Sequence, residues 1–164
     1  MHQIHVLFNI IICTASLTLV LISLFLALTD YCIRSWSRKF FIAVFVLLIA
    51  YIASLLVYML VLDRPGAVWL FLSRLTIFLQ SLFSSLLMPL LTNYILHLCK
   101  EPLKRSPLLR VAAALWLLYF GLLVTTLFTD GIYGFDSNNH YYRGPWYPVL
   151  LVPPALLLAV NMLA

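Results

Sequence analysis

Long, almost unbroken apolar runs alternate with short polar breaks along the chain, a pattern that predicts membrane-spanning helices. Five apolar segments stand out, at about residues 6–28, 40–62, 68–98, 110–128 and 146–164. A helix needs roughly 20 largely apolar residues to cross the hydrocarbon of a bilayer, and each segment is close to or above that length. We therefore expect an all-α integral membrane helix bundle, with five transmembrane helices in a single domain over residues 1–164.

Composition excludes the soluble classes. Hydrophobic residues make up 65% of the 164 residues and charged residues only 9%, whereas a soluble domain carries about 25% charged residues. A domain of this size cannot bury so much apolar surface in its own core, which makes the lipid bilayer the expected first partner. The first segment has no Lys or Arg before it and no small-residue cleavage site after it, so we interpret it as a retained span rather than a signal peptide.

The positive charges predict how the helices are oriented. The first and third breaks carry seven basic residues: Arg34, Arg38, Lys39, Lys100, Lys104, Arg105 and Arg110. The second and fourth breaks carry only Arg64 and Arg143. Because short cytoplasmic loops collect Lys and Arg, we expect the N-terminus outside and the C-terminus on the cytoplasmic side. The net charge of +5 then faces the anionic lipids of the inner leaflet, and no nucleic-acid partner is predicted.

The third segment has a polar half and an apolar half. At about 100° per residue, nine residues share the polar half: Ser73, Arg74, Thr76, Gln80, Ser81, Ser84, Ser85, Met88 and Thr92. The serines and threonines have two possible roles: they let helices approach closely and hydrogen-bond across the bundle, or they line a polar cavity. Close packing is the preferred explanation for the serines. Arg74 is different, because a charge inside a span costs roughly 2.5–3.5 kcal/mol on insertion scales. We expect it to form, with Gln80, an externally open pocket.

The charge of Arg74 also needs a partner. By depth, the nearest acids are Asp63, Asp130 and Asp136, all expected on the outer side. We therefore expect Arg74 to meet one of these carboxylates or the aromatic loop that precedes the last span.

That loop, over residues 129–145, is polar and rich in aromatic residues. Asn138 and Asn139 tolerate positive φ and have aromatic residues on both sides, which predicts a short extracellular hairpin between the fourth and fifth helices. Trp146 and Tyr147 fit the aromatic belt at the lipid–water boundary. Conspicuous polar loop residues often bind ligands, so four more candidates join Arg74 and Gln80 as ligand-binding residues: Asp136, His140, Tyr141 and Arg143.

Signatures of enzymes and metal sites are missing from the sequence. It contains no Gly-rich phosphate loop, no G-x-S-x-G elbow, no H-E-x-x-H and no pair of carboxylates inside a span, so we assign no catalytic residue and no cofactor. Cys13, Cys32 and Cys99 are expected to be free thiols, and their surroundings offer too few ligands for zinc. Pro153 and Pro154 are candidates for a broken helix of the transporter kind.

The outer-loop string resembles part of a known family. It consists of Tyr133, Phe135, Asp136, Asn139, Tyr141, Arg143, Gly144, Pro145, Trp146 and Tyr147, directly before a span. With the N-out helices and basic cytoplasmic links, it resembles the N-terminal membrane region of bacterial sensor histidine kinases, mainly the seven-helix type. Similar regions precede diguanylate cyclase domains.

The resemblance implies a signal-input module in a bacterial inner membrane. It would couple an external ligand or intramembrane signal to a cytoplasmic output domain, such as the histidine kinase of a two-component system, and it is compatible with a homodimer. The fifth span ends at residue 164 without a basic anchor, so we expect the chain to be the N-terminal part of a longer one, with any kinase or cyclase activity in the missing part. The alternative is a small transporter or channel subunit.

Overall fold

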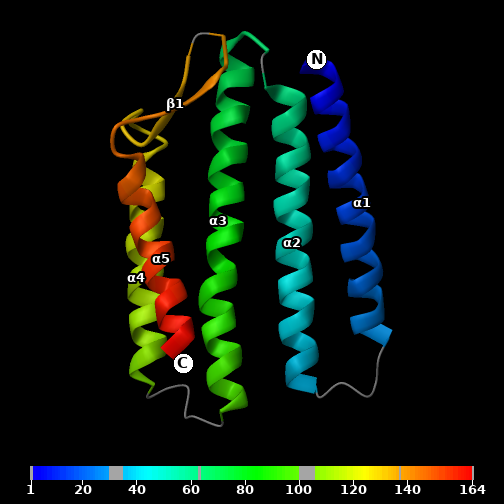
Figure 1. The fold of residues 1–164 in the computed structure, drawn as a ribbon, viewed down its shortest axis with the longest axis vertical. Helices are drawn as coiled ribbons and strands as arrows, with labels where there is room; N and C mark the ends of the chain where they lie inside the picture. The colour runs from blue at the N-terminus through cyan, green and yellow to red at the C-terminus, as the bar shows by residue number, and fades with distance from the viewer. Residues whose placement is uncertain (1, 30–34, 63, 100–105, 137, 164) are drawn as a thin grey trace.

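The computed structural model describes residues 2–29, 35–62, 64–99, 106–136 and 138–163, which are helical apart from one two-stranded hairpin and the connecting turns (Figure 1). The elements follow in the order α1 (His2–Thr29), α2 (Ser35–Val61), α3 (Ala67–Leu98), α4 (Pro107–Thr125), β1 (Tyr133–Phe135), β2 (Tyr141–Arg143) and α5 (Tyr147–Leu163).

Four of these helices are long and apolar enough to cross a membrane: α1 from Leu7 onward, α2, α3 and α4. Many of their large apolar side chains are exposed, for example Phe25, Phe71 and Leu117, which suits a surface in contact with lipid. The fifth helix is shorter. Its 17 residues extend about 25 Å at 1.5 Å per residue, against a hydrocarbon core of roughly 30 Å. The mostly helical fold agrees with the expectation of a multi-pass membrane protein.

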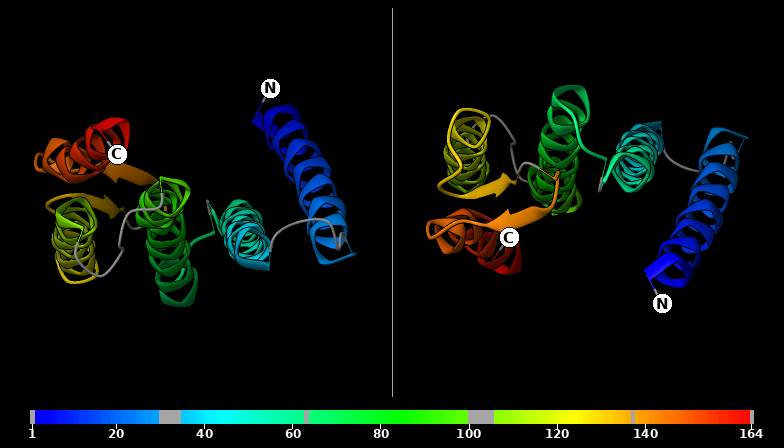
Figure 2. Two further views of the ribbon diagram at one scale, coloured as in Figure 1. Left: turned by 90° about the horizontal axis from the view of Figure 1, so that it is seen from below. Right: turned by 90° about the horizontal axis from the view of Figure 1, so that it is seen from above.

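Helix α3 is the centre of the bundle. It packs against α2 on one side and against α4 and α5 on the other, while α1 packs against α2 (Figure 2). The hairpin, the start of α1 and the turn between α2 and α3 are at the same end of the bundle, which we call the hairpin end (Figure 1). The starts of α2 and α4 and the last turn of α5 lie toward the opposite end.

Some helix limits differ from the predicted ones by a few residues. Helix α2 begins at Ser35, five residues before the expected start at residue 40. Helix α4 ends at Thr125, three residues before residue 128. There the backbone N–H groups of Phe128 and Thr129 both donate to the carbonyl of Thr125, at 3.1 and 3.0 Å, and the chain turns toward the hairpin.

Three prolines lie inside helices that continue past them. Pro89 is within α3, and Pro153 and Pro154 are within α5. The broken helix considered from the sequence at the two adjacent prolines is therefore absent, and α5 runs from Tyr147 to Leu163. Each proline removes one main-chain hydrogen bond, and neighbouring helices and polar side chains can satisfy the carbonyls left without a donor.

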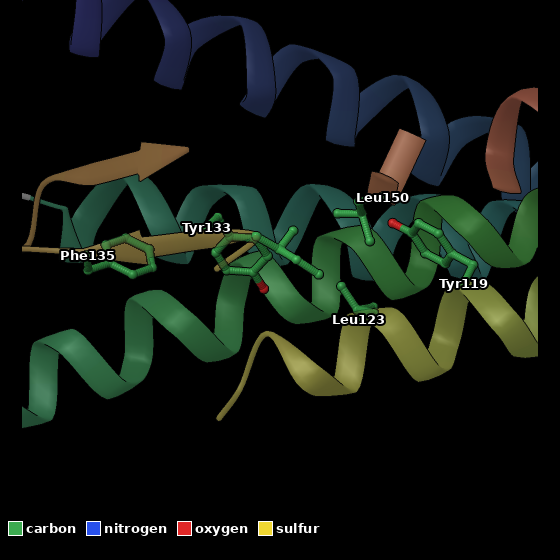
Figure 3. Close-up of a cluster of buried hydrophobic side chains, with 6 residues drawn as sticks. Tyr119, Leu123, Tyr133, Phe135 and Leu150 are labelled. Atoms are coloured by element: carbon green, nitrogen blue, oxygen red, sulfur yellow. The ribbon is translucent and has the colours of Figure 1, made fainter. Parts of the chain in front are cut away.

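The hairpin packs into the bundle. A buried apolar cluster joins residues of α4, the hairpin and α5: Tyr119, Leu123, Ile132, Tyr133, Phe135 and Leu150 (Figure 3). Tyr58 of α2 and Leu70 of α3 pack against it from the other side. The hairpin is therefore part of the hydrophobic core at its end of the molecule.

Candidate functional site

The predicted hairpin is present. Strands β1 and β2 pair antiparallel, with Gly134 opposite Tyr142 in the centre. A Cβ atom at Gly134 would lie 2.6 Å from the end of the Tyr142 side chain, so a larger residue there would make the exposed tyrosine ring shift. The ring packs on the glycine across the two strands.

The carboxylate of Asp136 organises the turn between the strands. Its Oδ1 accepts the backbone N–H groups of Asn138 at 2.9 Å and His140 at 2.8 Å, and its Oδ2 lies 3.2 Å from His140 Nδ1. Hydrogen bonding by the backbone and side chain of His140 and by the backbone of Asn138 lowers the pKa of Asp136 below its ordinary value. Asn139 adopts φ 65°, as its tolerance of the left-handed region predicts.

Asn139 attaches the hairpin tip to α2. Its side chain is fully buried, and Nδ2 donates to the carbonyl of Val61, the last residue of α2, at 3.0 Å. The last carbonyls of a helix have no partner within the helix, so Asn139 caps α2 from 78 residues away. We call this contact the tip clasp. Sequence reasoning had assigned Asn139 only a role in the turn.

Arg74 attaches the base of the hairpin to α3. Its guanidinium NH2 lies 2.7 Å from Oδ1 of Asp130, in the link between α4 and β1; the two side chains are 23% and 47% exposed. The expectation that Arg74 meets one of the three acids nearest to it in depth is confirmed, and Asp130 is that acid. The Nε of Arg74 is buried without a hydrogen-bond partner in the described part of the chain. We call the Arg74–Asp130 pair the base clasp.

A second polar contact lies beside the base clasp. The hydroxyls of Thr126 and Tyr133 hydrogen-bond at 2.9 Å, and the Thr126 hydroxyl is also 2.6 Å from the carbonyl of Leu123. Tyr133 is 2% exposed. Burial raises the pKa of its phenol, and the hydrogen bond with Thr126 and, more weakly, the nearby charge of Arg74 oppose this rise. The phenol is therefore neutral at physiological pH and packs as part of the core.

Arg74 and Gln80 do not face the same neighbour. Gln80 Nε2 donates to the carbonyl of Ser54 on α2 at 3.3 Å, whereas Arg74 turns to the hairpin base. Six residues along a helix correspond to a rotation that leaves the two side chains about 120° apart. Four residues of the polar half of α3 are buried, Ser73, Thr76, Ser85 and Thr92, but Ser84 is exposed.

The four loop candidates divide into two pairs. Asp136 and His140 are exposed at the hairpin tip. Tyr141 is partly buried between the rings of Tyr133 and Phe135, with centroids 6.0 and 5.8 Å away. Arg143 is exposed and lies over the Tyr147 ring of α5, 4.7 Å from its centroid. All four therefore lie on one hairpin, with Arg74 beneath its base.

The hairpin continues into α5 through a tightly packed link. The N–H of Gly144 donates to the Ile132 carbonyl at 2.8 Å, and the N–H of Trp146 donates to the Gly131 carbonyl at 3.0 Å. A Cβ atom on Gly144 would lie 2.2 Å from the Gly131 carbonyl oxygen, so only glycine fits. Hairpin and first turn of α5 therefore form one unit.

Within the described residues, no group of three His, Cys, Asp or Glu side chains could hold a metal ion. Cys13 and Cys99 are free thiols, while Cys32 and Asp63 lie outside the described residues. Comparison with protein-family models, curated proteins and solved structures finds no match to this chain. The histidine-kinase resemblance therefore stays a prediction.

Proposed function

We propose that this chain is a membrane-embedded signal-input module with five spans, its N-terminus and hairpin outside and its C-terminus on the cytoplasmic side of a bacterial inner membrane. Charge supports this orientation. Arg38, Lys39 and Arg110 lie in the first turns of α2 and α4, toward the end opposite the hairpin. Arg64 and Arg143 are the described basic loop residues at the hairpin end. Cytoplasmic loops are the ones that concentrate Lys and Arg.

One structural feature carries the proposal. The hairpin is held to α3 by the base clasp and to α2 by the tip clasp, and it continues into α5 through a packed link. A movement of the hairpin relative to α2 and α3 would therefore displace α5. Because α5 extends from the hairpin toward the opposite end, such a displacement would carry a signal across the membrane.

An external ligand could act at the base clasp or on the hairpin itself. An anionic group could compete with Asp130 for Arg74, and a polar ligand could bind Asp136, His140, Tyr141 or Arg143 on the hairpin. To shift the equilibrium, the ligand must bind the released arrangement more tightly than the clasped one. A cytoplasmic output domain, such as a histidine kinase, would read the movement of α5. The resemblance of the outer-loop string to sensor kinases supports this choice of output.

The test is whether loosening the base clasp moves the far end of α5. We would use the full chain in lipid nanodiscs, with its three cysteines changed to serine. Spin labels would replace Leu98 of α3 and Leu158 of α5, both exposed and toward the end opposite the hairpin. We expect Arg74→Leu and Asp130→Asn to shift or broaden the Leu98–Leu158 distance distribution.

Arg64→Leu is the matched control. Arg64 also lies at the hairpin end, but its guanidinium stacks on Trp69 at 4.9 Å rather than pairing with Asp130. This variant should leave the distribution unchanged. If Arg74→Leu and Asp130→Asn also leave the Leu98–Leu158 distance distribution unchanged, the hairpin does not communicate with α5 and the sensor proposal fails.

A further inference from the structure

A buried polar contact joins α3 and α5 within the apolar bundle, away from the hairpin. The Thr92 hydroxyl, fully buried, lies 2.6 Å from Oδ1 of Asn161. The Nδ2 of Asn161 donates to the Met88 carbonyl at 3.4 Å and lies 3.8 Å from the Met88 sulfur. Asn161 itself is only 9% exposed. A carboxamide in apolar surroundings needs such partners, because none are available from lipid.

The contact lies beside an interruption in the main-chain hydrogen bonding of α3. Pro89 lacks an N–H group, so the carbonyl of Ser85 loses its helical donor. One turn away, the Ser85 hydroxyl accepts a hydrogen bond from Trp116 Nε1 of α4 at 3.2 Å. Asn161 of α5 bonds to Met88 directly beside the proline. Helix α3 is therefore held by α4 and by α5 where its own main-chain hydrogen bonding is interrupted.

Thr92 has two acceptors for one proton. Its hydroxyl is 2.6 Å from Asn161 and 3.1 Å from the Met88 carbonyl of its own helix. If α5 moves away, Thr92 keeps a partner within α3, and only the carboxamide of Asn161 has to find new ones. Such a contact can open without leaving a buried hydroxyl unsatisfied. It can therefore hold α5 in place and still be released.

We propose that Asn161 is a releasable latch that holds α5 on α3 beside Pro89. The latch rests on these contacts alone; its role in signalling, where α5 moves by releasing it, rests on the proposed function. The tip and base clasps fix the hairpin end of this assembly, and the latch fixes α5 nearer its other end. An incoming signal would open the latch, and an output domain would sense the released α5.

The test uses the cysteine-free chain in nanodiscs, with labels at Leu98 and Leu158. Thr92→Val replaces the hydroxyl by a methyl group of similar size, and Asn161→Leu removes the carboxamide. Interhelical hydrogen bonds in membranes correspond to about three- to fifteenfold in an equilibrium constant. We therefore expect each variant to increase the ratio of the separated to the latched population by about that factor. The double variant should be no more open than Asn161→Leu alone.

Thr14→Val is the matched control. The Thr14 hydroxyl, on α1, bonds to the carbonyls of Ile10 and Ile11 in its own helix, at 3.0 and 2.9 Å, so the distribution should not change. A second label pair at Val68 and Phe128, exposed at the hairpin end, should keep its distance and show that the bundle is folded. If Asn161→Leu does not insert, Thr92→Val decides alone.

Unchanged Leu98–Leu158 distances in folded latch variants would overturn the latch, as would an equal change in Thr14→Val. The two proposals fail separately. If the latch variants open the helices but the Arg74 and Asp130 variants do not, the latch stands and the sensor proposal falls. If only the Arg74 and Asp130 variants change the Leu98–Leu158 distance, the hairpin moves α5 through another contact and Asn161 is not the latch.

Discussion

A guanidinium two turns into an apolar helix must be compensated by a charge or by a route to water. Arg74 has the carboxylate of Asp130 at 2.7 Å and remains about a quarter exposed, so it has both. Its planar group pairs with Asp130 through one nitrogen, whereas its Nε is buried without a hydrogen-bond partner in the described part of the chain. This residue therefore links α3 to the base of the hairpin.

Replacing Arg74 separates the free-energy cost of inserting its charge from its role in holding the hairpin. Arg74→Leu should still insert, because it removes a penalty of roughly 2.5–3.5 kcal/mol, but Asp130 then loses its partner. Amide hydrogen exchange over residues 130–135 should become faster, and Arg74→Lys should lie between wild type and Arg74→Leu, because an ammonium keeps the charge without the planar fork. Hydrogen-exchange mass spectrometry in nanodiscs would measure this. Unchanged exchange in Arg74→Leu would mean that the pair does not hold the hairpin.

How far single residues could be predicted depends on the range of their contacts. An acidic partner for Arg74 follows from depth, since each candidate acid falls in a break on the expected outer side in the sequence. The choice of Asp130 does not, because it depends on how the chain turns after Thr125. Asn139 could be assigned to a turn from its backbone preference, but its contact with Val61 joins residues 78 apart and leaves no local signal.

At the scale of elements, the hairpin turn depends on the ionised form of Asp136. The backbone and side chain of His140 and the backbone of Asn138 stabilise the carboxylate and lower its pKa below 3.8. A carboxyl whose pKa is lowered by folding contributes stability that is fully present above its ordinary pKa. This stability is lost as the pH falls through the lowered pKa. The turn should therefore stay ordered from neutral pH down to pH 3.8, the ordinary pKa of this carboxyl, and should open only at lower pH.

The amide resonance of Asn138 would report this opening in an NMR titration, because its N–H donates to Asp136 Oδ1. Asp136→Asn should remove the acid transition. It should also loosen the turn at neutral pH, because a neutral amide oxygen is a weaker acceptor than a carboxylate. An Asn138 transition centred well above pH 3.8, or one that persists in Asp136→Asn, would contradict this account of the turn.

The helices themselves were predictable from the length of the apolar runs, and the Asn138–Asn139 pair marked the hairpin. The helix ends were less so. Threonines beyond Thr125 turn the chain earlier than hydropathy alone indicates, and the tight Gly144 link fixes the start of α5. Pro153 and Pro154 were ambiguous, because whether a proline breaks a helix in a membrane depends on the neighbours that replace the lost hydrogen bond.

At the scale of the whole molecule, α3 contacts the hairpin base and three neighbouring helices through polar side chains. It pairs with the hairpin base through Arg74, with α2 through Gln80, with α4 through Ser85 and with α5 through Thr92. The polar half of its helical wheel was visible in the sequence. The assignment of each polar residue to a neighbouring helix was not, because the sequence of α3 does not show which helix lies against each part of its surface.

The proposed function depends most directly on which side of the membrane the hairpin faces. Single cysteines at Asn138, on the hairpin, and at Ser35, at the start of α2, are both exposed and can be placed in the cysteine-free chain. Intact bacterial cells expressing each variant would be treated with a membrane-impermeant maleimide. Asn138→Cys should be labelled in intact cells, and Ser35→Cys only after permeabilisation. Labelling of Ser35→Cys in intact cells, with Asn138→Cys protected, would place the hairpin in the cytoplasm and contradict the account.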